Sequence, residues 1–313
     1  MKRITSLLAG AALIVSLQGC TASTVDQRAT GTTVRPAPAG AAVERVQTTG
    51  PALWKVADAD TTIFLFGTVH LLPTTAQWMT PAIRDALASS DVMVTEILSS
   101  EMTDAAMQQQ MMARGMLPQG QTLRGLLTDE QRVAYEGALQ KLGIPAAAFD
   151  QFKPWMAAMT LSLLPLVQQG YTPDSGVEKV LEAQAGPHIQ RAALETVEFQ
   201  INVFDSMPQD AQIAYLIEVA QQADDIRPML DRMVAAWTAG DADGLAAIMN
   251  ESLQQNSDLA ERLLYARNRN WADWIAARLE QPGVVFMAVG AGHLAGQNSV
   301  QDILKQRRVV APR

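Results

Sequence analysis

Two of the three histidines in this chain stand in the same short pattern. Residues 63–71 and 286–294 each run as four apolar residues, a glycine, two small or apolar residues, a histidine and a leucine. Each pattern predicts a buried strand that ends at Gly67 or Gly290 and places His70 or His293 on the following loop. Sites of α/β proteins are commonly built at strand ends, so we predict that the two imidazoles share one site, as metal ligands or as a general base. The alternative is that each is a hydrogen-bonded core residue.

Two carboxylates also follow predicted strands. Glu96 comes directly after residues 92–95, and Glu195 follows a strand around residues 189–194. Two neutral imidazoles and one carboxylate suit a Zn, Mn or Fe ion with positions left for water or substrate. We therefore predict that His70, Glu96 and His293 are metal ligands and catalytic residues, with Glu195 a weaker candidate and a solvated Glu96 the alternative.

The elements that position these residues predict an α/β fold with a mixed central sheet, flanking helices and a large helical insertion between the two histidine motifs. Predicted strands cover residues 53–56 and 62–66 as a hairpin, then 92–95, 189–194, 284–289 and 309–310. Helices are predicted to start at Thr80-Pro81, at a capping box beginning with Thr128, and at Asp174 or Ser175. Residues 155–167 read as a buried helix, and residues 196–280 as almost wholly helical.

The first residues predict export. Residues 1–19 have the form of a signal peptide, with a basic start and an apolar stretch too short to cross a bilayer. Residues 17–20, Leu-Gln-Gly-Cys, resemble a bacterial lipobox, which implies a lipid on Cys20. Thr21 in place of Asp then implies an outer-membrane lipoprotein facing the periplasm; the alternative is an ordinary signal and secretion to the periplasm. Residues 20–50 are predicted to be a flexible tether before a domain at 51–313.

Composition excludes several classes of protein. Of 313 residues, 48% are hydrophobic and 18% charged, which supports a sizeable core and excludes a disordered chain. The net charge of −8 argues against a nucleic-acid partner, because phosphate contacts need a basic face. A single Cys excludes an intrachain disulfide framework and a zinc site built from cysteines. No phosphate loop, GxSxG elbow or HExxH helix occurs.

Several short motifs occur in an order and spacing typical of one family. They are Gly67-Thr68-Val69-His70, Glu96, Lys153-Pro154-Trp155, Leu194-Glu195-Thr196 with Gln200, Arg267-Asn268-Arg269-Asn270-Trp271, and Val289-Gly290-Ala291-Gly292-His293-Leu294 with Gly296. Over about residues 50–310 the chain therefore resembles the TraB/GumN family. That family is similar to the Tiki metal-dependent proteases, and more distantly to erythromycin esterase and the haem-binding ChaN lipoproteins.

The resemblance implies a metal-dependent hydrolase, specifically a Tiki-like peptidase acting on a peptide or small-molecule substrate. Its two GxxH motifs and glutamate fall on His70, His293 and Glu96. It also implies that Arg267 and Asn268 bind a substrate carbonyl or carboxylate, where the residues alone indicate solvated charge on a helix. Three alternatives stay open: a His–Glu pair that activates water without metal, a lipoprotein that binds haem, metal or peptide without turnover, and an accessory role in exopolysaccharide production.

Overall fold

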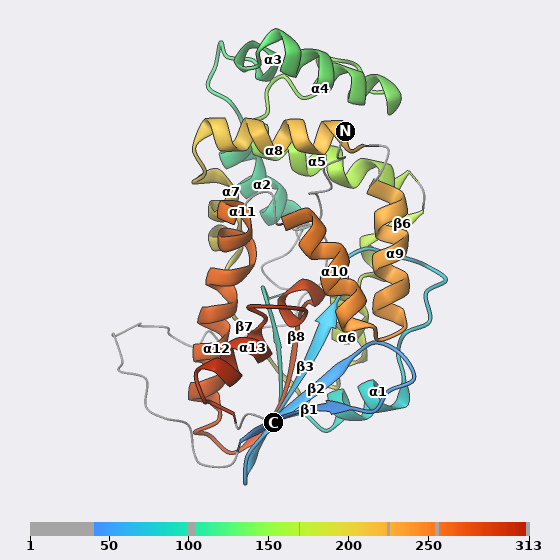
Figure 1. Cartoon of the computed structure of the whole chain (residues 1–313), viewed down its shortest axis with the longest axis vertical. Helices are drawn as coiled ribbons and strands as arrows, with labels where there is room; N and C mark the ends of the chain where they lie inside the picture. The colour runs from blue at the N-terminus through green and yellow to red at the C-terminus, as the bar shows by residue number, and fades with distance from the viewer. Residues whose placement is uncertain (1–40, 99–103, 169, 224–225, 254–256, 311–313) are drawn as a thin grey trace.

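A six-stranded mixed sheet forms the base of the molecule (Figure 1). The computed structural model describes residues 41–98, 104–168, 170–223, 226–253 and 257–310. In sheet order the strands are β1 (Ala42–Val46), β2 (Leu53–Ala57), β3 (Thr61–Thr68), β8 (Gly283–Gly290), β5 (Val92–Thr95) and β7 (Gln190–Ala193). The first three are antiparallel neighbours, whereas β3, β8, β5 and β7 run parallel. The predicted α/β fold class is confirmed.

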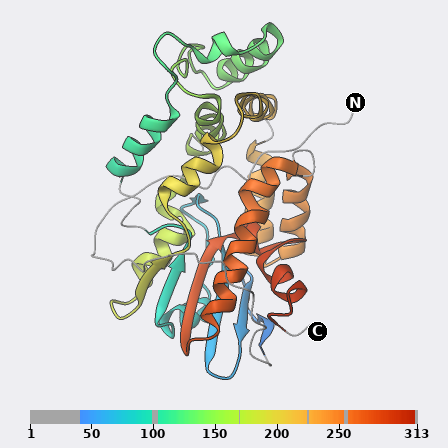
Figure 2. The same cartoon turned by 90° about the vertical axis from the view of Figure 1, so that its left-hand side faces the viewer.

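Helices cover both faces of the sheet because its central strands are apolar on both sides. On β3, Ile63 and Leu65 pack with α12 (Ala266–Arg278) and α13 (Val300–Gln306), while Phe66 faces the opposite side with α1 (Pro81–Ala88). Figure 2 shows α12 lying along one face of the sheet. Strands buried on both faces are expected to read as near-continuous apolar runs, as the two histidine motifs do.

The segment between β3 and β8 supplies most of the helices, together with β5 and β7, and rises beyond the carboxyl ends of the parallel strands (Figure 1). Its helices are α1, α2 (Asp104–Gly115), α3 (Leu123–Leu126), α4 (Asp129–Lys141), α5 (Pro154–Val167), α6 (Val177–Gln184), α7 (Val197–Asp205), α8 (Gln209–Gln221), α9 (Ile226–Thr238), α10 (Ala242–Leu253), α11 (Ser257–Ala260) and α12. A small two-stranded sheet pairs β4 (Leu72–Pro73) with β6 (Tyr171–Thr172). A π-helical segment, Glu261–Tyr265, runs directly into α12.

Most of the helix starts that the capping residues predict are confirmed. Thr80 caps α1 and accepts the Ile83 amide, and Thr128 and Gln131 form the predicted capping box of α4. The predicted cap at Asp174 or Ser175 is wrong, because both residues lie in a 3₁₀ turn, Pro173–Ser175, and α6 starts after Gly176. The strand predicted at residues 309–310 is also wrong: this apolar pair is buried against the core in a bend after α13.

The folded part begins earlier than the sequence predicts. The predicted tether extends to Gly50, whereas Ala42–Val46 forms β1, whose side chains alternate too weakly to reveal an edge strand. The predicted signal peptide and Cys20 lie outside the described residues. In the part of the chain that the structure describes, none of the helices combines the length and the apolar character needed to span a bilayer.

The packing of α12 on the sheet can be tested by truncating Ile275, which is completely buried there. We expect Ile275→Ala to lower the free energy of unfolding by about 2–5 kcal/mol, since it leaves a cavity. The control is Val133→Ala on α4, where the side chain is 73% exposed and a change within about 0.5 kcal/mol is expected. Urea denaturation followed by circular dichroism measures both, and equal effects would contradict this packing.

Candidate active site

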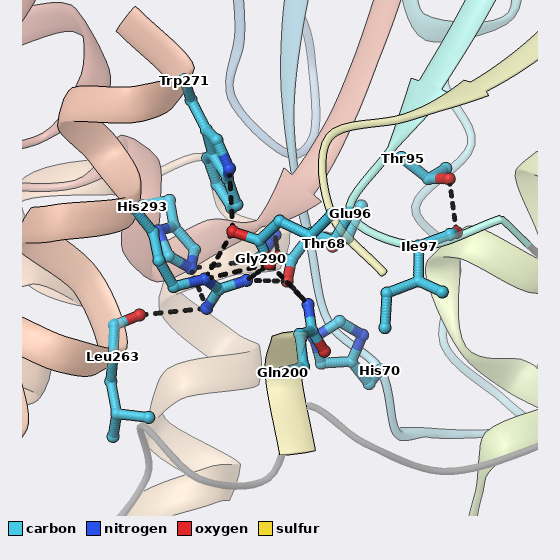
Figure 3. Close-up of polar contacts among 12 residues, drawn as sticks. Thr68, His70, Thr95, Glu96, Ile97, Gln200, Leu263, Trp271, Gly290 and His293 are labelled. Carbon is cyan, nitrogen blue, oxygen red and sulfur yellow. Dashed lines mark hydrogen bonds and ion pairs between the residues drawn. The ribbon is translucent and has the colours of Figure 1, made fainter. Parts of the chain in front are cut away.

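The carboxyl ends of the four parallel strands bring the predicted site residues together. His70 follows β3, His293 follows β8, Glu96 follows β5 and Glu195 follows β7. Because β8 lies between β3 and β5, the side chains that follow these three strands emerge at one sheet edge. Figure 3 shows Glu96 beside Gly290, with His70 and His293 on either side.

His70 is held by a carboxylate that the sequence analysis missed. Its Nδ1 lies 2.7 Å from Oε1 of Glu178, the second residue of α6, and the same oxygen accepts a hydrogen bond from the Thr68 hydroxyl. The Val177 amide donates to the Val69 carbonyl, which fixes α6 against the loop after β3. Gly176 permits this approach, because a Cβ there would lie 2.4 Å from the His70 carbonyl oxygen. A glycine just before a helix was the only local signal for this contact.

Glu96 is buried, and one of its two carboxylate oxygens has no capacity for a further hydrogen bond. Its Oε2 accepts hydrogen bonds from Arg267 Nη2 at 2.5 Å and from Gln200 Nε2 at 2.9 Å. Its Oε1 accepts the Gly290 amide at 2.7 Å, so the strand end that carries His293 also holds Glu96. The Glu96 carboxylate is therefore fixed in position, and only Oε1 has accepting capacity left for another group.

Arg267 lies beneath the histidines on α12, with its side chain 7% exposed. Its guanidinium pairs with Glu96 and with Glu195, and the remaining hydrogens go to the Leu263 carbonyl and to Nε2 of His293. All five N–H donors of the guanidinium are thereby used within the protein. Glu195 in turn accepts the indole N–H of Trp271 at 3.0 Å.

His293 has a defined tautomer. Asn268 donates through Nδ2 to the Asn298 carbonyl, so its Oδ1 faces His293 Nδ1 at 2.6 Å and accepts the proton that this nitrogen carries. Nε2 is then the unprotonated nitrogen, and it accepts from Arg267 at 3.2 Å. The imidazole is thus held neutral between an amide oxygen and a guanidinium.

The two histidines have pKa values displaced in opposite directions. For His70, burial favours the neutral form, but the charge and hydrogen bond of Glu178 and the charge of Glu96 outweigh burial and raise the pKa to about 9. For His293, burial and the neighbouring Arg267 lower the pKa to about 3. Burial alone would raise the pKa of Glu96, yet Arg267 and the two histidines lower it well below its usual range. At neutral pH the site holds a charged His70, a neutral His293 and an ionised Glu96.

The side chains of Glu96, His293 and His70 converge on Gly290. A methyl placed on its Cα would be 3.1 Å from Glu96 Oε1, 3.4 Å from His293 Cδ2 and 3.8 Å from His70 Nε2. A Cβ would crowd Glu96 Oε1, so glycine at this position lets the three side chains approach one another. The glycine in the motif therefore adds no side chain between Glu96 and His70.

The donor types suit a divalent metal, but their arrangement does not fit one. Nε2 of His293 lies 3.9 Å from Glu96 Oε1, but it accepts from the Arg267 guanidinium, a cation that would repel a metal at the same place. Among the described residues, no group of three or more His, Cys, Asp or Glu side chains is spaced to hold a metal ion. A metal bound by His70, Glu96 Oε1 and His293 would require Arg267 to move away from His293 Nε2.

Above this cluster opens a largely apolar cleft with a volume of about 780 Å³, its open mouth included. The floor contains His70, Glu96, Arg267, Gly290 and His293, and the walls come from α5, α9, α10 and the π-helical segment. An apolar concavity with a few converging polar groups is the usual form of a binding site. The polar cluster is therefore accessible from one side.

The structure does not support direct substrate binding by Arg267 and Asn268. Both are buried, and the arginine has no spare N–H, while the Asn268 side chain is bonded to His293 and Asn298. Arg267 and Asn268 also do not lie on a solvated helix face, which is what the residues alone indicate. Gly67 and Glu195 do support the site: a Cβ on Gly67 would come within 3.0 Å of Ala291 Cα, and Glu195 anchors Arg267.

The opposite protonation of the two histidines can be measured by an NMR titration, since the chain has only three. We expect one histidine signal to titrate near pH 9 and to be absent in His70→Gln. In Glu178→Gln the signal should titrate at lower pH, because the Glu178 charge no longer offsets the effect of burial on the pKa of His70. Because the folded pKa of His70 is raised, its stabilisation should be lost as pH rises from 6.5 to about 9. A His70 signal at or below 6.5 in the wild type would contradict the Glu178 pairing.

Comparisons with known proteins identify the family and several relatives of this chain. The model of the TraB/PrgY/gumN family matches residues 52–311, which include every strand end of the site. An uncharacterized protein of Treponema pallidum (strain Nichols) is 22% identical over 270 residues, 82% of this chain and 81% of its own length. The uncharacterized proteins YbaP of Escherichia coli (strain K12) and of Shigella flexneri are each 25% identical over 190 residues, 60% of this chain and 70% of theirs. No solved structure matches significantly. The chain belongs to the TraB/PrgY/gumN family.

Proposed function

We propose that this protein is a hydrolase, specifically a peptidase, in which the His70–Glu178 pair activates a water molecule held beside Glu96. The observation that carries the proposal is that Glu96 Oε1 and His70 Nε2 converge at the floor of the cleft, where they would lie 3.1 Å and 3.8 Å from a Cβ added to Gly290. A carboxylate and an imidazole that line the floor of one cleft are the parts that general acid–base hydrolysis needs.

His70 is a better general base than Glu96, although His70 is mostly protonated at neutral pH. With a pKa of about 9, roughly one molecule in a hundred carries neutral His70 at pH 7. Glu96 is ionised throughout, but a carboxylate with a lowered pKa accepts protons poorly. Glu96 therefore orients the water by accepting one of its hydrogens, and the other hydrogen points toward His70.

The reaction then proceeds through one proton shuttle. Neutral His70 takes a proton from the water on Nε2 while the water oxygen bonds to the substrate carbonyl carbon, and Glu178 stabilises the imidazolium that forms. His70 next donates that proton to the leaving nitrogen as the C–N bond breaks, giving a carboxylic acid and an amine. Arg267 and His293 keep Glu96 in place and do not contact the reacting atoms.

A metal-dependent form of the same hydrolase is the competing proposal. The resemblance to the Tiki proteases and the donor types of His70, Glu96 and His293 support it. It requires Arg267 to move away from His293 Nε2, and for that reason we favour the metal-free form.

We propose that the enzyme acts in the periplasm, held to the outer membrane by a lipid on Cys20. The signal-like residues 1–19 and the lipobox-like residues 17–20 support this placement. The mature chain is acidic, so its attachment to a membrane would run through the lipid and not through protein charge.

The proposed binding of water at Glu96 can be tested with Gly290→Ala, whose methyl would lie 3.1 Å from Glu96 Oε1 and hinder the approach of water to it. We expect kcat/KM for cleavage of a mixed peptide library, followed by mass spectrometry, to fall by at least about 100-fold while the fold is kept. The control is Gly137→Ala on α4, where an added methyl meets nothing within 4 Å and activity should be unchanged. Full activity in Gly290→Ala would refute the water position, and absence of cleavage by the wild type would refute the function.

Metal content separates the two forms of the proposal. We expect elemental analysis of the purified wild type to find far less than one Zn, Mn or Fe per chain, and a chelator to leave cleavage unchanged. The matched variants are His70→Ala and His293→Ala. A stoichiometric metal that both variants lose would establish the metal-dependent form instead.

A further inference from the structure

Resting on the proposed function, we propose that the substrate is a peptide with a large uncharged apolar side chain next to the bond that is cut. The apolar half of the cleft is the pocket for that side chain. It is lined by Leu166, Leu230, Met233, Val234, Met249 and Leu264.

The pocket adjoins the reacting groups. The apolar residues and the floor groups His70, Glu96 and Gly290 line one continuous cleft. Leu264 belongs to the π-helical segment that runs into α12 and Arg267, and a Cβ on Gly292, one residue before His293, would touch Met249. A side chain in the pocket therefore lies next to a carbonyl placed at the floor of the cleft between Glu96 and His70.

The charges of the cleft favour a neutral side chain. Within the described part of the chain, its only ionisable lining groups are His70, Glu96, Arg267 and His293. Glu96 and Arg267 are paired with each other, and the arginine has no donor left. A charged substrate side chain would lose its hydration and find no partner among the apolar walls, which costs free energy.

The residues that line the pocket also indicate that it accepts apolar substrate side chains of different shapes. Leu166, Leu230, Met249 and Leu264 are buried, whereas Met233 and Val234 are half-buried and would be covered by a bound side chain. Covering such a surface is favourable, and methionine adapts its shape to different apolar groups. We therefore expect leucine, methionine and phenylalanine to be accepted, with alanine binding weakly because it fills little of the space.

Binding can be measured separately from turnover with the peptides acetyl-Gly-Ser-Gly-X-Gly-Ser-Gly-amide, where X is Leu, Ala or Asp. Isothermal titration calorimetry with the wild type should give a Kd for the Leu peptide at least about tenfold lower than for the Ala peptide, since burying three more carbons is favourable. The Asp peptide should bind more weakly than the Ala peptide. In Met233→Asp the Leu preference should fall below about threefold, whereas Met233→Leu and the surface control Val133→Asp should keep it.

Each outcome decides the inference independently of catalysis. A Leu preference that Met233→Asp removes supports the pocket even if the peptide is never cut, and in that case only the proposed function fails. Equal Kd values for the three peptides, no measurable binding of any of them, or a preference that survives in Met233→Asp would overturn the inference. Circular dichroism of each variant checks that the chain is folded.

Discussion

The site depends on the ion pairs and hydrogen bonds of the buried Arg267 guanidinium. The guanidinium is a cation in a low-dielectric setting, and it is stable there because two carboxyl groups and two further acceptors take all of its hydrogens. The same contacts keep Glu96 ionised and His293 neutral. Breaking one partner out of such a buried pair commonly costs about 3–5 kcal/mol, so the charge states of the cluster are coupled to the fold itself.

The parallel strands make this arrangement possible. Glu96 and Glu195 follow neighbouring strands β5 and β7, and α12 crosses the face of the sheet so that Arg267 reaches both. The π-helical segment before α12 also supplies the Leu263 carbonyl that the guanidinium uses. Such segments are often found at functional sites, because they shift the direction in which the following side chains point. The position of α12 therefore also fixes the ion pairs that Arg267 makes with Glu96 and Glu195.

The sequence predicts those parts of the site that local pattern controls. The apolar runs that end in Gly67 and Gly290 predict the strands correctly, and the capping signals at Thr80 and Thr128 predict helix starts, because these features depend on neighbouring residues alone. Glu178 was missed since its contact with His70 depends on how α6 packs against β3, which no spacing reveals. Lys153 and Trp155 of another motif both bond to Asp205, and so join α5 to α7 away from the polar cluster.

The two histidine motifs show why a shared pattern does not give a shared role. Each places an imidazole after a buried parallel strand, yet the Nδ1 atoms meet different partners: a carboxylate for His70 and an amide oxygen for His293. A carboxylate stabilises the imidazolium, whereas an amide oxygen beside a guanidinium stabilises the neutral ring. One site thus contains an imidazole that can give up and regain a proton and another that stays neutral. Pairs of groups with pKa values driven apart by their surroundings are a known mark of acid–base sites, and here the separation comes from side chains contributed by α6 and α12.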